Sequence, residues 1–238
     1  MSLSHNKFNI QHLPYEVLQQ IFILSSNPNF AFVSRLFHNI ATSQTSVKTQ
    51  WLLHKFNYDC TKALYRGLKW RFFNKTILNQ LDSIYYQSKL KKGENSSDEV
   101  IQVIPCKDRA IPQWFFSIPD PKGTYYEMVK ILLERGASPN ESDGYPIIKS
   151  AQLGRLKMAK LLLSFNANPG IKDNMALKVT AKDANIEMVN LLIKRGAKPD
   201  SDTLRIAVER KHWHMAELLV SHGAPATPEV VAAFEKNK

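Results

Sequence analysis

Four segments of the C-terminal half share one pattern of apolar and polar positions. They begin at Met128, Met158, Met188 and Met215, and each has apolar residues at its first, second, fourth, fifth and sixth positions. These positions cover a wide face of an α-helix. A glycine, or Asn166 in the second copy, follows each segment where a left-handed residue ends a helix. The pattern predicts four amphipathic outer helices.

A second apolar pattern precedes three of these helices and predicts a partner helix for each. Its large apolar residues are Ile147, Leu177 and Leu204, and each precedes a pair of small or β-branched residues by three positions. Two short helices cannot bury their apolar faces alone and do so against neighbouring pairs. The fixed period therefore predicts an all-α solenoid. We expect one row of outer-helix residues at the seam between units, namely Leu133, Leu163, Ile193 and Leu219.

The N-terminal segment has its own helical pattern. Pro14 suits the first turn of a helix, and Glu16 suits the positive end of the helix dipole. Apolar residues then recur at Val17, Leu18, Ile21 and Phe22, and a second amphipathic helix is predicted at Val33, Leu36, Phe37, Ile40 and Ala41. So short a segment is too small for a self-sufficient core, and part of its apolar surface is expected to meet another surface.

Composition excludes several classes of protein. The chain has 238 residues, of which 44% are hydrophobic and 22% charged, so it is expected to fold. It has neither a long apolar run nor a secretory start, and we expect no membrane association. Its two cysteines cannot form a disulfide framework, which predicts the reducing cytoplasm and/or nucleus. None of its nine glycines forms a phosphate-binding loop.

No residue pattern predicts catalysis, so we expect a protein that is not an enzyme and has no cofactor. His212 and His214 do not share a helix face, which disfavours a metal site. Cys60 has no ordered partner for nucleophilic chemistry. The net charge of +11 is spread along the chain, so nucleic acid is an unlikely partner. Two interpretations remain open for Trp114, Phe115 and Phe116. These residues either anchor an interface between repeat units or form an exposed hook for a partner.

The segment from Tyr145 to Leu163 resembles the ankyrin repeat, whose helical phrase is TPLHxAAxxGHxEVVKLLLxxGA. This resemblance implies paired helices with a concave protein-binding surface. The repeat period here is shorter than the usual period of about 33 residues, so we expect trimmed hairpins. The family's variable contact positions imply target-binding residues at Gln152, Leu153, Lys182, Asp183, Glu209 and Arg210. The positive charge of the chain is compatible with an acidic target protein.

The order Leu-Pro-x-Glu-Val-Leu-x-x-Ile-Phe, followed by Val-Ser-Arg-x-Phe, resembles the F-box. That helical motif docks substrate receptors onto the Skp-type adaptor of cullin-RING ubiquitin ligases. The linker between its helices is shorter here than in the usual form. The resemblance implies that Leu18, Leu36, Phe37 and Ile40 pack internally. It implies adaptor contacts at Leu13, Pro14, Glu16, Val17, Ile21, Phe22, Val33 and Ser34.

These patterns predict a series of domains along the chain. We expect a tail at 1–9, an F-box-like motif at 10–45, a helical linker with a degenerate ankyrin-like unit at 46–87, an insertion loop at 88–123, ankyrin repeats at 124–226 and a C-terminal cap at 227–238. A polar stretch with the sequence Gly-Glu-Asn-Ser-Ser-Asp-Glu motivates the insertion.

Two functional classes agree with this organisation. In the first, the chain is the substrate-recognition subunit of an SCF-type ubiquitin ligase, with an adaptor-binding motif and a target-binding solenoid. In the second, it is an ankyrin scaffold or sequestering protein without a ubiquitin role, and the N-terminal helix only caps the stack. A weaker third alternative is a basic module that binds nucleic acid.

Overall fold

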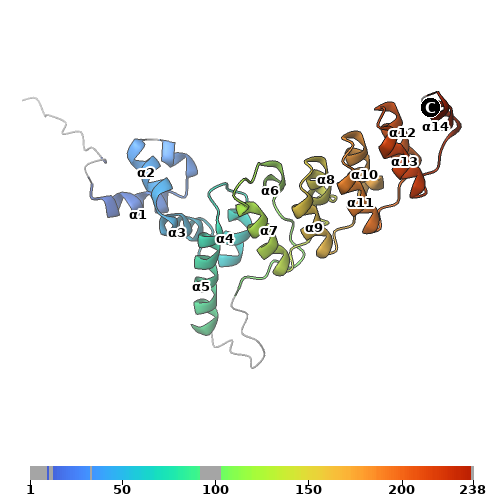
Figure 1. Ribbon diagram of the computed structural model, residues 1–238. Coiled ribbons are helices and arrows are strands. Elements are labelled where there is room, and N and C mark those ends of the chain that lie inside the picture. Colours follow the sequence, from blue (N-terminus) through green and yellow to red (C-terminus); the bar gives the residue numbers. More distant parts are fainter. Residues whose placement is uncertain (1–9, 11–12, 33, 92–102, 237–238) are drawn as a thin grey trace, which may run out of the picture. The chain divides into compact units, whose positions relative to one another are not determined.

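The protein folds into helices, as the computed structural model shows for residues 10, 13–32, 34–91 and 103–236 (Figure 1). The described residues contain no β-strand and only one isolated bridge, between Ala110 and Ser138. The predicted all-α fold class is therefore confirmed. The chain divides into two compact units, Met1–Pro105 and Cys106–Lys238.

The first unit is built around the buried indole of Trp51. Its ring centroid lies 6.4 Å from that of Phe22, 5.3 Å from that of Trp70 and 6.1 Å from that of Phe72. Helix α1 packs on α2 and α3, and α5 packs on α3 and α4. The elements are α1 (Tyr15–Ser25), the 3-10 helix η2 (Pro28–Phe32), α2 (Arg35–Ser43), α3 (Thr45–Lys55), α4 (Cys60–Gly67) and α5 (Lys75–Lys91).

The second unit is a row of helix pairs (Figure 1). The inner helices α8 (Tyr145–Gln152), α10 (Ile171–Lys182) and α12 (Ser201–Glu209) pack side by side, and each packs on the outer helix that follows it. Residues 172–174 have positive φ angles, so the regular part of α10 begins after them. The remaining helices are α6 (Trp114–Ser117), α7 (Thr124–Glu134), α9 (Leu156–Ser164), α11 (Ile186–Lys194), α13 (Trp213–Ser221) and α14 (Pro228–Glu235).

The repeat core follows the predicted apolar rows, with one correction. Ile147, Leu177 and Leu204 are fully buried in the inner helices. In the outer helices the uniformly buried row is Leu132, Leu162, Leu192 and Leu219. The expected seam row mixed two registers, because the residue in register with Leu163 is Val220, which is 41% exposed. The last outer helix therefore exposes a position that α9 buries.

The termini of the outer helices agree with the sequence pattern. Gly136, Gly196 and Gly223 have φ angles between 87° and 98°, and Asn166 has a φ of 62°. Each of these residues therefore occupies the left-handed region where a helix ends. Residues 165–170 and 195–200 are all that join α9 to α10 and α11 to α12, which is the trimming that the short period predicted.

The region expected as an insertion loop, 88–123, is divided between regular elements. Helix α5 continues to Lys91, and residues 92–102 lie outside the described residues. The backbone N–H of Cys106 donates to the Arg135 carbonyl, and that of Asp108 donates to the Gly136 carbonyl, so this segment belongs to the first repeat. Helix α6 is the short inner helix of that repeat. The turn-forming residues around it shorten the helix without excluding it from the stack.

The interpretation of residues 114–116 as an exposed hook is wrong. Phe115 and Phe116 are fully buried, and the ring of Trp114 stacks on Phe115 with centroids 4.0 Å apart. Tyr125 of α7 contacts both rings edge-on. The aromatic cluster therefore joins α6 to α7 and supplies the core that a four-residue helix lacks.

The parts flanking the repeats correspond to other predicted boundaries. Helix α14 lies in the predicted cap at 227–238 and packs on α12, where it buries Val230. The predicted linker at 46–87 contains α3, α4 and most of α5. The pair α4 and α5 occupies the predicted degenerate unit, but α5 has 17 residues whereas α9 has 9. The ankyrin character of this pair stays a prediction.

Candidate functional site

Helix α1 has two apolar faces, only one of which is covered. Leu18 and Phe22 are buried inside the first unit. Val17 is 41% exposed and Leu24 is 60% exposed, while Leu13 and Ile21 are half-buried. Val17, Ile21 and Leu24 are spaced three or four residues apart, so they follow one side of the helix, and Leu13 lies just before the helix begins. We call these four residues the α1 stripe.

The structure divides the expected adaptor contacts into residues on or beside the α1 stripe and residues that a partner cannot reach. Leu13, Val17 and Ile21 belong to the α1 stripe, and Pro14 and Glu16 are exposed beside it. Phe22 is not available for an adaptor, because its ring packs on Trp51 in the core. This correction has a simple cause, since adjacent helical residues point about 100° apart, and Phe22 therefore turns away from Ile21.

The second helix of the motif contributes less exposed apolar surface. The Ser34 hydroxyl accepts a hydrogen bond from the backbone N–H of Phe37, which makes Ser34 the N-cap of α2. Val33, another expected adaptor contact, lies outside the described residues. Phe37 and Ile40 are fully buried, as expected for internal packing, and Leu36 is half-buried.

Leu24 is an exposed residue that the motif comparison missed. It is the most exposed apolar residue of α1 and lies seven positions after Val17. A separation of seven residues is about two helical turns, so this spacing is the sequence signal that could have placed Leu24 beside Val17. The first phrase of the motif ends at Phe22 and the second begins at Val33, so Leu24 lies between them, which explains the omission.

A second candidate surface lies at the ends of the inner helices. The six predicted target-binding residues are all exposed, and they occupy the C-terminal ends of α8, α10 and α12. Because α8 packs on α10 and α10 packs on α12, these ends lie along one edge of the repeat unit. We call the row made of Gln152, Leu153, Lys182, Asp183, Glu209 and Arg210 the inner-helix row.

Hydrogen bonds between repeats hold the backbone near the inner-helix row. Arg155 Nη2 donates to the Ile118 carbonyl at 2.6 Å, and His212 Nε2 donates to the Lys182 carbonyl at 3.1 Å. Arg155 and His212 hold equivalent positions just before α9 and α13. Asn185, at the same position before α11, caps its own helix by accepting from the Met188 N–H. His212 therefore has a structural role that connects neighbouring units.

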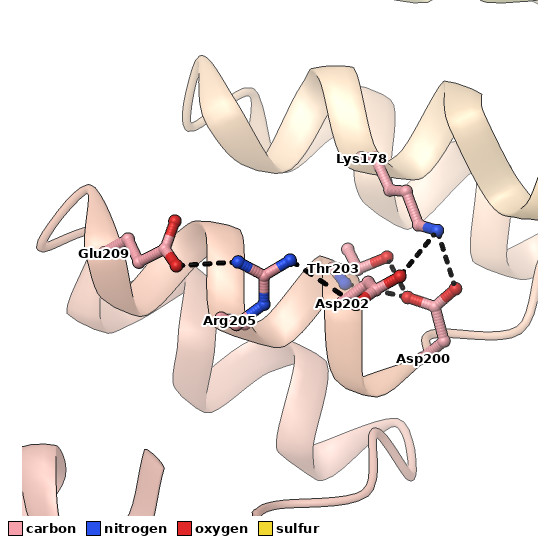
Figure 2. Close-up of polar contacts among 6 residues, drawn as sticks. All are labelled: Lys178, Asp200, Asp202, Thr203, Arg205 and Glu209. Carbon is pink, nitrogen blue, oxygen red and sulfur yellow. Dashed lines mark hydrogen bonds and ion pairs between the residues drawn. The ribbon is translucent and has the colours of Figure 1, made fainter. Parts of the chain in front are cut away.

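A charged network joins α10 to α12 (Figure 2). Lys178 Nζ lies 3.5 Å from a carboxylate oxygen of Asp200 and 3.2 Å from one of Asp202. Arg205 continues the network to Asp202 at 3.5 Å and to Glu209 at 2.8 Å. Glu209 also belongs to the inner-helix row. The network therefore connects the start of α12 to the candidate surface at its end.

The network shifts the pKa values of Lys178 and Asp200 toward their charged forms. Burial acts to lower the pKa of Lys178, but the carboxylates of Asp202 and Asp200 outweigh burial and raise it. Burial acts to raise the pKa of Asp200, but hydrogen bonds from Thr203 and the charge of Lys178 outweigh burial and lower the pKa below its ordinary value. Asp200 also caps α12 by accepting from the Thr203 N–H at 2.7 Å.

We expect Asp200→Asn to destabilise the repeat unit by about 0.5–1 kcal/mol near neutral pH, because asparagine retains the cap but loses the ion pair. The lowered pKa of Asp200 means that its contribution is present above the unfolded-state pKa and is lost as pH falls through the folded-state pKa. Urea unfolding at a series of pH values should show the wild type and the variant converging below about pH 4. A difference in the free energy of unfolding between the two proteins that stayed constant at acid pH would contradict the role of the Asp200 charge.

The described residues bear on metal binding, membrane insertion and thiol chemistry. They contain no group of three or more His, Cys, Asp or Glu side chains placed to hold a metal ion. Within the same residues, no helix combines the length and apolarity needed to cross a bilayer. The side chains of Cys60 and Cys106 are buried, and burial, together with the charge of Asp59, raises the pKa of the Cys60 thiol. A raised pKa makes a thiol a poorer nucleophile at neutral pH.

Comparison with known families supports the two-part organisation. Residues 122–203 match the family model of ankyrin repeats in three copies, and residues 11–42 match the YDR249C N-terminal domain. No curated protein and no solved structure matches the chain. The C-terminal part thus contains ankyrin repeats, which are protein-interaction modules, and it indicates binding to a protein partner. The comparisons do not identify the N-terminal segment as an F-box.

Proposed function

We propose that this protein is the substrate-recognition subunit of an SCF-type ubiquitin ligase in the cytoplasm or nucleus. In this proposal the α1 stripe docks the Skp-type adaptor, and the inner-helix row binds the target protein. The observation that carries the proposal is the exposure of Val17 and Leu24 on a helix whose opposite face is already buried. A second apolar face on a short helix fits recognition by a groove on another protein.

The α1 stripe can supply a useful part of the binding energy. Burying one large aliphatic side chain contributes about 1.5–3 kcal/mol, and Val17, Ile21 and Leu24 each retain exposed apolar surface. Pro14 sets the direction in which the chain enters α1, and Glu16 adds a charge beside the stripe. The resemblance to the F-box places its adaptor contacts on this same helix.

A receptor of this kind performs no chemistry. It holds the target near a ubiquitin-conjugating enzyme and so raises the effective concentration of the target's lysines. Selectivity then depends on binding at the inner-helix row. This row carries charges of both signs, positive at Lys182 and Arg210 and negative at Asp183 and Glu209, so a target that complements them would gain specificity as well as affinity.

A scaffold or sequestering protein without a ubiquitin role is the second candidate function. It is favoured by the match of residues 11–42 to the YDR249C N-terminal domain, which does not identify an F-box. Both candidate functions use the repeat unit to bind a protein. They differ in the partner of the α1 stripe, so a test of binding to the Skp-type adaptor distinguishes them.

Replacing Val17 and Leu24 with glutamate is expected to weaken binding of a purified Skp-type adaptor more than tenfold. The reason is that two carboxylates would have to be buried in an apolar interface. Titration calorimetry with the full-length chain measures this change. Leu13→Ala combined with Pro14→Ala should also weaken binding more than tenfold, because it removes apolar area and the pre-set turn.

The matched control is Val220→Glu, since Val220 is 41% exposed on α13 of the other unit. It should leave adaptor affinity unchanged, and circular dichroism should show that all variants remain helical. If the wild type does not bind the adaptor, or if the α1 variants bind as tightly as the wild type, the ubiquitin-ligase function is wrong and the scaffold function stands.

A further inference from the structure

The first unit contains an apolar cavity that the proposed function does not use. Its volume is about 350 Å³, which lies within the range typical of small-molecule sites. The aromatic side chains of Phe22, Trp51, Trp70 and Phe72 form much of its wall. These residues come from α1, α3 and the segment between α4 and α5, and parts of η2 and α2 complete the lining. The cavity therefore depends on the whole tertiary fold of this unit.

The ionisable side chains that line the cavity are all basic. Lys48 and His38 are the ionisable residues among the described residues that line the cavity, and no acidic residue lines it. Lys48 Nζ donates to the Thr42 carbonyl at 2.9 Å, which holds the ammonium beside the end of α2. An ammonium next to apolar walls favours a ligand that combines an apolar body with a negative end.

One residue of the cavity wall, Trp51, contains a buried donor that lacks an acceptor. Trp51 Nε1 has no hydrogen-bond partner, although the side chain of Trp51 is 2% exposed. Leaving such a donor unpaired costs stability, and an unpaired donor at a functional cavity is a reason to look for a missing acceptor. The nitrogen is shielded from water, so a ligand in the cavity would reach it only if neighbouring side chains moved.

We propose that this cavity binds a small aromatic carboxylate. The aromatic walls of Trp51, Trp70 and Phe72 suit a flat apolar ring, and Lys48 provides the positive charge for the carboxylate. Because Phe22 and Trp51 join α1 to α3 across one side of the cavity, a bound ligand would stabilise the unit that carries the α1 stripe. This inference is independent of the proposed ubiquitin role.

The test titrates 2-naphthoate into the full-length chain by calorimetry and by heteronuclear NMR. We expect saturable binding with one site per chain, and a melting temperature that rises with ligand concentration. Ala41→Leu should weaken binding more than tenfold, because Ala41 lines the cavity and leucine would fill it. Lys48→Met should weaken 2-naphthoate about five- to tenfold while changing the affinity for uncharged naphthalene-2-carboxamide less than twofold.

The matched control is Ala232→Leu, which makes the same change at an exposed position of α14. This variant should bind as the wild type does. Absence of saturable binding to the wild type, or unchanged binding by a folded Ala41→Leu variant, would overturn the proposal. Equal losses of both naphthyl ligands in Lys48→Met would overturn the assignment of the carboxylate to Lys48.

Discussion

Gly144→Ala is expected to destabilise the repeat unit by about 2–5 kcal/mol, one of the two largest effects in this chain. Gly144 precedes α8 with a φ of 70°, a left-handed conformation that costs another residue about 1–2 kcal/mol. A β-carbon added there would lie 2.2 Å from Cγ2 of Ile171 and 3.2 Å from its Cβ. Relief of this overlap must move the start of α10, which adds about 1–3 kcal/mol.

Gly123→Ala provides a matched control for this prediction. Gly123 precedes α7 with the same φ of 70°, but a β-carbon there would meet no atom within 4 Å. The control therefore contains the backbone cost without the overlap, and it should destabilise the protein by only about 1–2 kcal/mol. Urea denaturation of both variants measures the difference. Equal losses of stability in the two variants would show that the side chain of Ile171 can move away without cost, and that α8 and α10 are less tightly packed than the structure indicates.

The repeat unit could be predicted from the sequence because its determinants are local and periodic. Ile147, Leu177 and Leu204 recur at the same position in each unit, and all three are buried. The short inner helix α6 could not be predicted, because its four residues carry no periodic signal. What places α6 in the stack is tertiary, namely the contact of Phe115 with Tyr125 of the next helix.

The candidate surfaces were predictable to different degrees. The inner-helix row follows from the repeat register, and its exposure agrees with the expected positions. The assignment of Phe22 failed because the motif does not distinguish the two apolar faces of α1. The cavity could not be predicted at all, because it brings together Phe22, Trp51 and Trp70, which no local pattern connects. Long-range packing of aromatic residues thus decides which apolar residues remain available to a partner.

The packing of α1 on the core affects how the N-terminal unit can bind a partner. Trp51 packs on Phe22 of α1, so the helix that presents the α1 stripe is held by the core of its own unit. A helix held in this way loses little conformational entropy when its exposed face binds a partner. Val17 and Leu24 can therefore contribute more of their apolar surface to affinity than the same residues in an unfolded segment.

The buried leucine row of the outer helices is expected to contribute strongly to the stability of the repeat unit. Leu162→Ala, in the central helix α9, is expected to lower the free energy of unfolding by about 2–5 kcal/mol. Leu162 is fully buried, and the repeats on both sides of α9 limit how far the structure can close around the cavity. Leu153→Ala is the control, because Leu153 is exposed at the end of α8 and its truncation should change stability by less than about 0.5 kcal/mol.

Leu219→Ala makes the same change in the same row, but in the last outer helix, α13. Leu219 is as deeply buried as Leu162, so the two variants lose equal apolar contact area in the folded state. The difference arises from cooperativity, since a terminal repeat can unfold while the others remain folded, and a central repeat cannot. Denaturation of Leu219→Ala should therefore show an early, partial loss of helix followed by a main transition close to that of the wild type. A single transition displaced as far as that of Leu162→Ala would mean that α14 couples the last repeat fully to the stack.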